Sequence, residues 1–264
     1  YENGKITYMR TDSTYISKDF QKTIQKKITD DYSKDYYKEF SSRKKKVKGA
    51  QEAHECIRPT NINHELNEKW GDTERKLYNL IKKRTITSHM KPAIYNVLTI
   101  HLCNKNLKPI GYFQGKHKTL QFGGYLIYSQ PELQQVKNEK LTISEDTLFL
   151  LEKSICRDIE SQPPQFYNES SIVKKLESSG IGRPSTYASI ISTVLNRNYT
   201  VQETIPEKNI EIDVIELNSK NKIMERKEEK KINPQKNRIL LTDLGKRVLD
   251  YLLNHFSNII NIDF

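Results

Sequence analysis

Hydrophobic and polar positions follow three different patterns along the chain. Over residues 1–92, a short strand at 5–9 precedes charged helices, one of which carries the apolar stripe Leu77, Leu80 and Ile81. Over residues 93–160, the β-branched and aromatic run 95–102 is typical of a strand, and glycines separate further short strands such as 125–128. The chain is therefore expected to pass from helices to a small β-rich region.

Helical periodicity returns after residue 160. One helix, capped by Ser170, is expected to end at Gly180, and another begins at Pro184 and Ser185. The second helix has one apolar face with the spacing of a buried stripe, made by Tyr187, Ile190, Ile191, Val194 and Leu195. Thr242 caps a last helix, whose inward residues are expected to be Leu244, Val248, Leu249 and Leu252.

A charged insertion at about 204–238 interrupts this helical region. Residues 219–238 hold eight Lys or Arg against three Glu, a local net charge of +5, and little that can pack. We expect a mobile segment here, with a strand at 210–214. The run 43–48 is also strongly charged and is expected to be a solvated loop or helix end.

Together the patterns predict an α+β fold with several lobes. The 264 residues suffice for one large domain or two smaller ones, but 35% hydrophobic and 29% charged residues indicate an extensive, wet surface. We expect a mixed unit at 1–92, a β-rich unit at 93–160, and a helical unit at 161–264 that contains the insertion.

Composition narrows the class of partner. The formal net charge of +11 favours a polyanion, and nucleic acid ahead of a membrane, because no long apolar run or basic amphipathic anchor occurs. The three cysteines are far apart and form no C-x-x-C pair. A zinc site or a disulfide framework is therefore not expected, and a reducing compartment is the simpler inference.

The segment 6–14 carries the candidate chemistry. A phenol has a pKa near ~10 and is a weak nucleophile at neutral pH unless a cation favours its phenolate. Arg10 lies two residues after Tyr8 and supplies such a cation, which can also hold a phosphate. Composition alone favours the plainer interpretation, since each of 15 tyrosines is more often a packed or surface ring.

Four segments, in order, resemble the motifs of the type IA DNA topoisomerases. They are 6–14, 51–60, 179–193 and, more weakly, 241–245. The methionine before Arg10 is similar to the bacterial topoisomerase I version, whereas the topoisomerase III version usually has proline there. Cys56 stands where the family usually has alanine, and Asn198 stands where glycine is common. Asparagine tolerates the left-handed conformation, so the second departure changes little.

The resemblance implies a reaction and roles for particular residues. Tyr8 would attack a phosphodiester of single-stranded DNA, leave a 5′-phosphotyrosyl link and free a 3′-hydroxyl, without ATP. Consistent with this, the sequence has no phosphate-binding loop motif. Arg10 would stabilise the phosphate and the phenolate, and His54 would lie near the bound strand with Asp12 orienting its ring. Arg58 is expected to be structural.

The third segment has features of a phosphate-binding helix start. Ser185 and Thr186 lie where free N–H groups and the helix dipole favour an anion, with Arg183 just before them and Arg197 one helix length later. The alternative is an ordinary capped helix with solvated arginines. We expect single-stranded DNA as the partner and a monomeric protein.

Mg²⁺ is implied by the resemblance, in an acidic lobe upstream of the tyrosine. This sequence contains no D-x-D-x-D cluster and no zinc module, so no metal ligand is expected within it. Because the chain begins at Tyr1 rather than methionine, we expect a piece of a longer protein, inactive alone. A bacterial source would put it in the cytoplasm, associated with the nucleoid.

Two other functions fit part of the sequence. A winged-helix duplex-binding protein has the same order of helix, turn, helix, strands and helix after residue 165. A degenerate topoisomerase homologue would bind DNA without cutting it. Trapping a covalent adduct excludes the first, and an acidic cluster upstream of Tyr1 would argue against the second.

Overall fold

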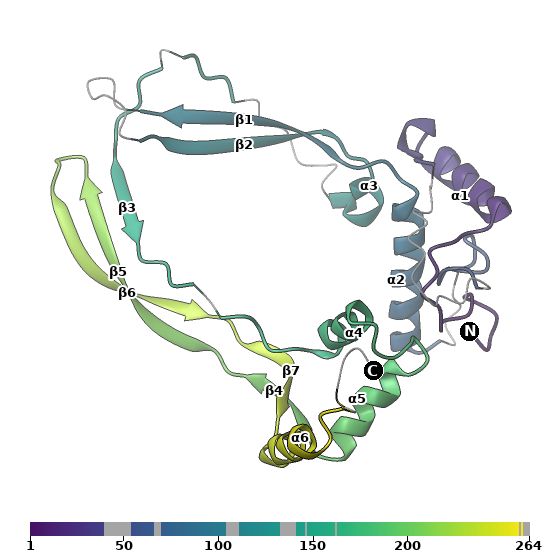
Figure 1. The fold of residues 1–264 in the computed structure, drawn as a ribbon. Helices are drawn as coiled ribbons and strands as arrows, with labels where there is room; N and C mark the ends of the chain where they lie inside the picture. Colours follow the sequence, from purple (N-terminus) through teal and green to yellow (C-terminus); the bar gives the residue numbers. More distant parts are fainter. Residues whose placement is uncertain are drawn as a thin grey trace. The chain divides into compact units, whose positions relative to one another are not determined.

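The chain forms two compact units of mixed helix and sheet, Tyr1–Ser144 and Glu145–Phe264 (Figure 1). The computed structural model describes residues 1–39, 54–65, 70–103, 111–132, 141–145, 147–161, 163–258 and 260. The mixed fold agrees with the expected α+β class, while the division into three units stays a prediction. The basic run 43–48 and residues 51–53 of the second motif lie outside the described residues. Within the described part, no helix is long and apolar enough to cross a membrane.

The core of the first unit is built mainly by one amphipathic helix. The helices of the first unit are α1 (Lys18–Asp31), which is the amphipathic one, the short 3₁₀ helix η1 (Lys34–Tyr36), α2 (Asp72–Ser88) and α3 (Leu126–Ser129). Isoleucines and a phenylalanine spaced four residues apart put one continuous buried stripe on α1 and on Ile16, two residues before it. The buried cluster comprises Ile16, Phe20, Ile24, Ile28, Ile62, Ile86 and Met90.

The expected stripe on α2 is only partly buried. Leu77 and Leu80 are 55% and 53% exposed, whereas Tyr78 and Ile86 are buried. The helix itself was predicted correctly, but the face that packs is rotated from the one that its leucines suggested.

An antiparallel pair of strands completes the first unit. The strands are β1 (Ile94–Leu102) and β2 (Phe113–Phe122), and β1 confirms the strand predicted at 95–102. The strand predicted at 125–128 is wrong, because α3 occupies this stretch. Gly124 has φ +48°, and a Cβ there would lie 2.4 Å from the Pro92 carbonyl, so the chain turns at this glycine into α3.

The strand predicted at 5–9 is reduced to a single bridge. Ile6 pairs with Pro59 in an isolated antiparallel bridge, and Thr7 N–H donates to the carbonyl of Arg58 at 2.9 Å. This short pairing attaches the segment around Tyr8 to the second motif.

The helices of the second unit agree with the sequence prediction, apart from the residue that caps the first of them. They are α4 (Glu169–Ser178), α5 (Tyr187–Asn196) and α6 (Asp243–His255). Asn168, rather than Ser170, caps α4 through a reciprocal pair of hydrogen bonds with Ser171. Thr242 caps α6 as predicted, with its hydroxyl accepting from the N–H of Gly245 at 3.0 Å.

Burial on α5 and α6 differs. The predicted stripe of α5 is half-buried or buried, with Ile191 only 7% exposed. On α6, Leu244 and Leu249 are 49% and 41% exposed, so the prediction that they face inward is wrong for the described part of the chain.

The charged insertion is folded into strands rather than mobile. The second unit contains β3 (Lys153–Arg157), β4 (Thr200–Ile205), β5 (Lys208–Asn218), β6 (Ile223–Ile232) and β7 (Gln235–Leu241). They form a three-stranded sheet of order β3-β5-β6 and a two-stranded sheet of β4 and β7, all antiparallel. The strand expected at 210–214 is confirmed as part of β5, and the expectation of a mobile segment is corrected.

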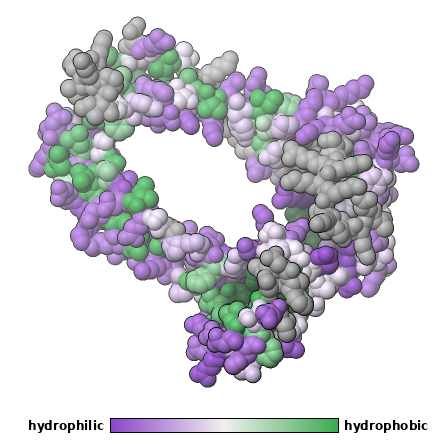
Figure 2. Space-filling view, in the orientation of Figure 1, coloured by the Kyte–Doolittle hydropathy of each residue, from purple (hydrophilic) through white to green (hydrophobic). Residues whose placement is uncertain are grey.

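Cross-strand ion pairs compensate part of the charge of this segment. Glu211 accepts from Lys227 at 2.5 Å, Glu207 pairs with Lys231 at 2.7 Å, and Arg157 of β3 reaches Glu228 of β6 at 2.8 Å. Two lysines of β6, Lys227 and Lys231, therefore pair with an acid on β5 and with one in the turn before it. Hydrophilic residues cover most of the visible surface of both units, with hydrophobic ones interspersed (Figure 2).

Candidate active site and DNA-binding helix

The backbone beside Tyr8 is held to the second motif by the side chain of Thr7. The Thr7 hydroxyl donates to the carbonyl of Cys56 at 2.7 Å and accepts from the N–H of Arg58 at 2.9 Å. Together with the Thr7 N–H bond to Arg58, these contacts fix the register between the two motifs. Tyr8 and His54 are thereby brought side by side.

The Tyr8 and His54 rings are in direct contact. Their centroids are 4.8 Å apart with the planes tilted by 42°, and both side chains are half-buried. Tyr1 packs against Tyr8 as well, edge to face, with a centroid distance of 5.3 Å and an interplanar angle of 69°. The sequence placed His54 near the bound DNA strand through its motif, but neither its contact with Tyr8 nor that of Tyr1 was predicted.

Arg10 and Asp12 lie on the exposed loop that follows. Among the described residues, neither side chain makes a hydrogen bond or an ion pair, and none joins Asp12 to His54. The Arg10 guanidinium is therefore available to an external anion. The orienting role expected for Asp12 stays a prediction.

The second motif is anchored to α1 by Glu55 and Arg58. One carboxylate oxygen of Glu55 accepts from the N–H of Ser17 at 3.0 Å, and the other forms an ion pair with Arg58. The Arg58 guanidinium also lies 3.8 Å above the ring of Phe20, a cation–π contact with the core. These contacts give Arg58 the structural role expected of it and fix the segment that carries His54.

Cys56, which departs from the family pattern, contributes packing rather than reactivity. It packs against the core of the first unit, and burial raises the pKa of its thiol to about 11. The thiol therefore stays protonated at neutral pH, and a thiolate nucleophile beside Tyr8 is disfavoured.

The four residues predicted to bind DNA lie at the two ends of α5. Arg183 N–H donates to the hydroxyl of Thr186 at 2.9 Å, and its guanidinium donates to the carbonyl of Gly182 at 2.7 Å. Ser185 is exposed just before the helix, and Thr186 is its N-terminal cap residue. Hydroxyl groups and a guanidinium thus lie together at the start of α5, where the N–H groups of Thr186 and Tyr187 donate to the Arg183 carbonyl.

Arg197 ends the same helix at its C-terminal cap. It is exposed, and Asn198 after it has φ +55°, the left-handed conformation expected there. The Asn198 carbonyl accepts from the hydroxyl of Thr242 at 2.6 Å, which ties the end of α5 to the start of α6. Arg183 and Arg197 therefore do not form one cluster but mark opposite ends of one helix.

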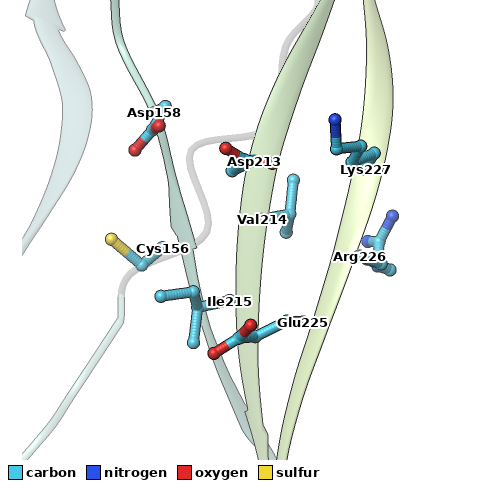
Figure 3. Close-up of a pocket in the computed structure, with 8 residues that line it drawn as sticks. All are labelled: Cys156, Asp158, Asp213, Val214, Ile215, Glu225, Arg226 and Lys227. Atoms are coloured by element: carbon cyan, nitrogen blue, oxygen red, sulfur yellow. The ribbon is translucent and has the colours of Figure 1, made fainter.

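A hollow of about 550 Å³ lies on the sheet β3-β5-β6, away from all of these residues in the sequence. Cys156 and Asp158 line it on the β3 side, and Glu225, Arg226 and Lys227 extend from β6 (Figure 3). Within the described ranges, no group of three or more His, Cys, Asp or Glu is arranged to hold a metal ion. Among these described residues no Mg²⁺ ligand set is therefore assigned, and no step below is given to a metal.

Comparison with known proteins shows the family. The family model described as DNA topoisomerase matches residues 1–227. A mimivirus protein called DNA topoisomerase 1 type prokaryotic is 38% identical over 100% of this chain and 33% of its own length. DNA topoisomerase 1 of Rickettsia bellii is 40% identical over 78% of this chain and 27% of its own length.

A solved structure agrees with these relatives. Full-length topoisomerase I from Thermotoga maritima superposes with a TM-score of 0.64 and 28% identity, covering 98% of this chain and 36% of that one. The chain belongs to the type IA DNA topoisomerases, of the bacterial topoisomerase I kind. It spans about a third of the length of these relatives.

Proposed function

We propose that this chain supplies the DNA-cleaving tyrosine of a type IA topoisomerase. The Tyr8 hydroxyl oxygen forms a bond to the phosphorus of a single-stranded DNA phosphodiester, and the bond from phosphorus to the 3′ oxygen breaks. The phenol gives up its proton and the departing 3′ oxygen gains one. The reverse exchange reseals the strand, so one ester bond replaces another and no ATP is consumed. Passage of a second strand through the break would relax supercoils.

The observation that carries the proposal is the packing of Tyr8 on His54, with the backbone held by Thr7, in a chain of this family. Arg10 is an exposed cation two residues from the phenol and suits a phosphate that gains charge in the transition state. His54 adds a second polar group, in contact with the Tyr8 ring. Asp12 is assigned to orienting His54 by the resemblance alone.

The proposed DNA track runs along α5. Arg183, Ser185 and Thr186 would hold one backbone phosphate at the helix start, and Arg197 would hold another at its end. This arrangement contacts phosphates and sugars rather than base edges, which suits a flexible single strand of any sequence. We further propose a monomer, Mg²⁺ held by an upstream lobe outside these residues, and a cytoplasmic, nucleoid-associated location in a bacterial source.

A winged-helix duplex binder is the second candidate. The order α4, turn, α5, strands and α6 in the second unit favours it. Such a protein makes no covalent bond to DNA, so one experiment separates the two candidates.

The experiment is adduct trapping with the full-length protein that contains this chain. Single-stranded DNA labelled at its 3′ end is incubated with wild-type protein or Tyr8→Phe and quenched with detergent. We expect a denaturant-resistant labelled protein band for the wild type and none for Tyr8→Phe, with noncovalent binding retained, because only the hydroxyl is removed. Normal adduct in the mutant would reject Tyr8, and no adduct in either protein would favour the winged-helix candidate.

A further inference from the structure

The side chain of Tyr1 is 55% exposed, yet its ring contacts the ring of Tyr8. Its ring meets the Tyr8 ring edge to face, and the His54 ring meets Tyr8 as well, so the phenol has an aromatic neighbour from each of two segments. Exposure of more than half its surface means that Tyr1 adds little to the core. At this position, the Tyr1 side chain contributes its contact with the Tyr8 ring.

The turn that carries Tyr1 is held in place by specific bonds. Gly4 N–H donates to the Tyr1 carbonyl at 2.8 Å, and Gly4 has φ +64°, a conformation that side chains other than glycine rarely adopt. The Gly4 carbonyl accepts from the hydroxyl of Thr60 at 2.6 Å, and the Thr60 N–H donates to the backbone carbonyl of Lys5 at 3.0 Å. Thr60 belongs to the same motif as His54, so one motif positions both neighbours of Tyr8.

Tyr8 needs such neighbours because its local backbone is irregular. It follows a single bridge rather than a strand, and within the described residues its phenol makes no hydrogen bond that would fix it. A tyrosine side chain in such a place can visit several staggered rotamers. Ring contacts with two residues, Tyr1 and His54, reduce that freedom, and an oriented nucleophile reacts faster than a mobile one.

We propose that Tyr1 is a positioning residue that holds the Tyr8 phenol in one orientation through edge-to-face packing. This rests on the proposed function of Tyr8. Tyr1 touches the nucleophile's ring and not the reacting atoms, so it acts on the rate of the chemical step. It does not set the affinity for DNA.

The test compares Tyr1→Leu, which removes the ring, with Tyr1→Phe, which keeps it. The full-length protein is mixed with saturating 3′-labelled single-stranded DNA, and the first-turnover rate of adduct formation and the Kd are measured separately. An aromatic pair contributes enough for a loss of about two- to tenfold in that rate with Tyr1→Leu. The rate should return with Tyr1→Phe, and the Kd should be unchanged in both.

Tyr15→Leu is the matched control. Tyr15 is 52% exposed, lies in the same segment, and has no ring contact with Tyr8 among the described residues. Tyr15→Leu should keep the wild-type rate of adduct formation. That result would show that losing an exposed tyrosine side chain does not by itself slow the reaction.

Each other outcome has a definite meaning. An unchanged rate in Tyr1→Leu, or an equal loss in Tyr1→Phe, overturns the role of ring packing. A raised Kd with a normal rate at saturation overturns it too, because Tyr1 would then contact the DNA. Failure of the wild-type protein to form any adduct, or adduct formation by Tyr8→Phe, counts instead against the proposed function.

Discussion

At the scale of single residues, the candidate site depends on small groups that hold larger ones. Thr7 fixes the backbone beside the nucleophile, and Glu55 and Arg58 fix the segment that carries His54. The groups proposed to bind DNA, by contrast, are exposed and make few hydrogen bonds with the rest of the protein. Their contribution should therefore appear in binding and not in folding.

The arginines at the ends of α5 provide a direct test of this difference. Arg183→Ala and Arg197→Ala in the full-length protein should each weaken binding to single strands of every sequence. Each lost phosphate contact should reduce the slope of log K against log salt by roughly 0.7, because fewer counterions are released. The measurement is a salt titration of single-strand affinity with two unrelated sequences. Loss for one sequence only, at an unchanged slope, would indicate base contacts instead.

The sequence selected candidate site residues but not their neighbours. The motif order pointed to Tyr8, Arg10 and His54, whose roles stay a prediction, and the structure brings Tyr8 and His54 together. The contact with Tyr1 and the bonds of Thr7 were not predictable, because they depend on how a turn and a bridge fold back on a distant motif. No periodic pattern encodes such contacts.

At the scale of elements, β5 and β6 account for the largest error of the sequence interpretation. Charge density suggested a mobile segment, but Asp213 of β5 lies opposite Lys227 of β6, and Lys227 forms an ion pair with Glu211 diagonally across the two strands. A single window of sequence shows only the local net charge and not the pairing. The alternation of Ile210, Ile212 and Val214 did identify β5, because a period of two reports one covered face.

The leucines of α6 show the opposite error. Their spacing predicted a helix correctly, yet Leu244 and Leu249 are exposed in the described part of the chain. Helical periodicity defines which residues share a face of the helix. Whether another element covers that face depends on the tertiary structure. Positions that repeat in sequence therefore predict the element with more certainty than its burial.

The β5–β6 hairpin is also what orders β3. Among the described strands, β3 pairs with β5 alone, and Arg157 of β3 reaches across to Glu228 of β6. A two-stranded hairpin is marginal in water, so the third strand and the hairpin stabilise one another. Val214, between the two arginines of its neighbouring strands, is only 1% exposed.

Removing the hairpin should therefore release β3. Replacing residues 206–234 with Asn-Gly closes β4 and β7 through a tight turn. We expect the amides of residues 153–157 to lose protection from hydrogen exchange, while those of β7 and α6 keep theirs. Lys220→Ala, at the exposed hairpin tip, serves as the control and should change neither. Unchanged protection of β3 in the shortened protein would show that another element orders it.

At the scale of the whole molecule, the chain spans about a third of its relatives and has a net charge of +11. Purified residues 1–264 should bind single-stranded DNA but fail to relax a supercoiled plasmid over a range of Mg²⁺ concentrations. Binding rests on groups within the chain, whereas the described residues offer no metal site. Sustained relaxation by these residues alone would contradict this account, and equal affinity for duplex and single strands would favour the winged-helix candidate.

The identity of the nucleophile is the central claim, and the tryptic pattern around Tyr8 makes it measurable. Trypsin cleaves after Lys5 and Arg10, and the peptide 6–10 contains Tyr8 as its single tyrosine, while Tyr15 falls in the peptide 11–18. The full-length protein is trapped on single-stranded DNA, digested with nuclease and trypsin, and analysed by mass spectrometry. We predict a nucleotide joined through its 5′-phosphate to peptide 6–10. A nucleotide on any other peptide, including 11–18, would contradict the account.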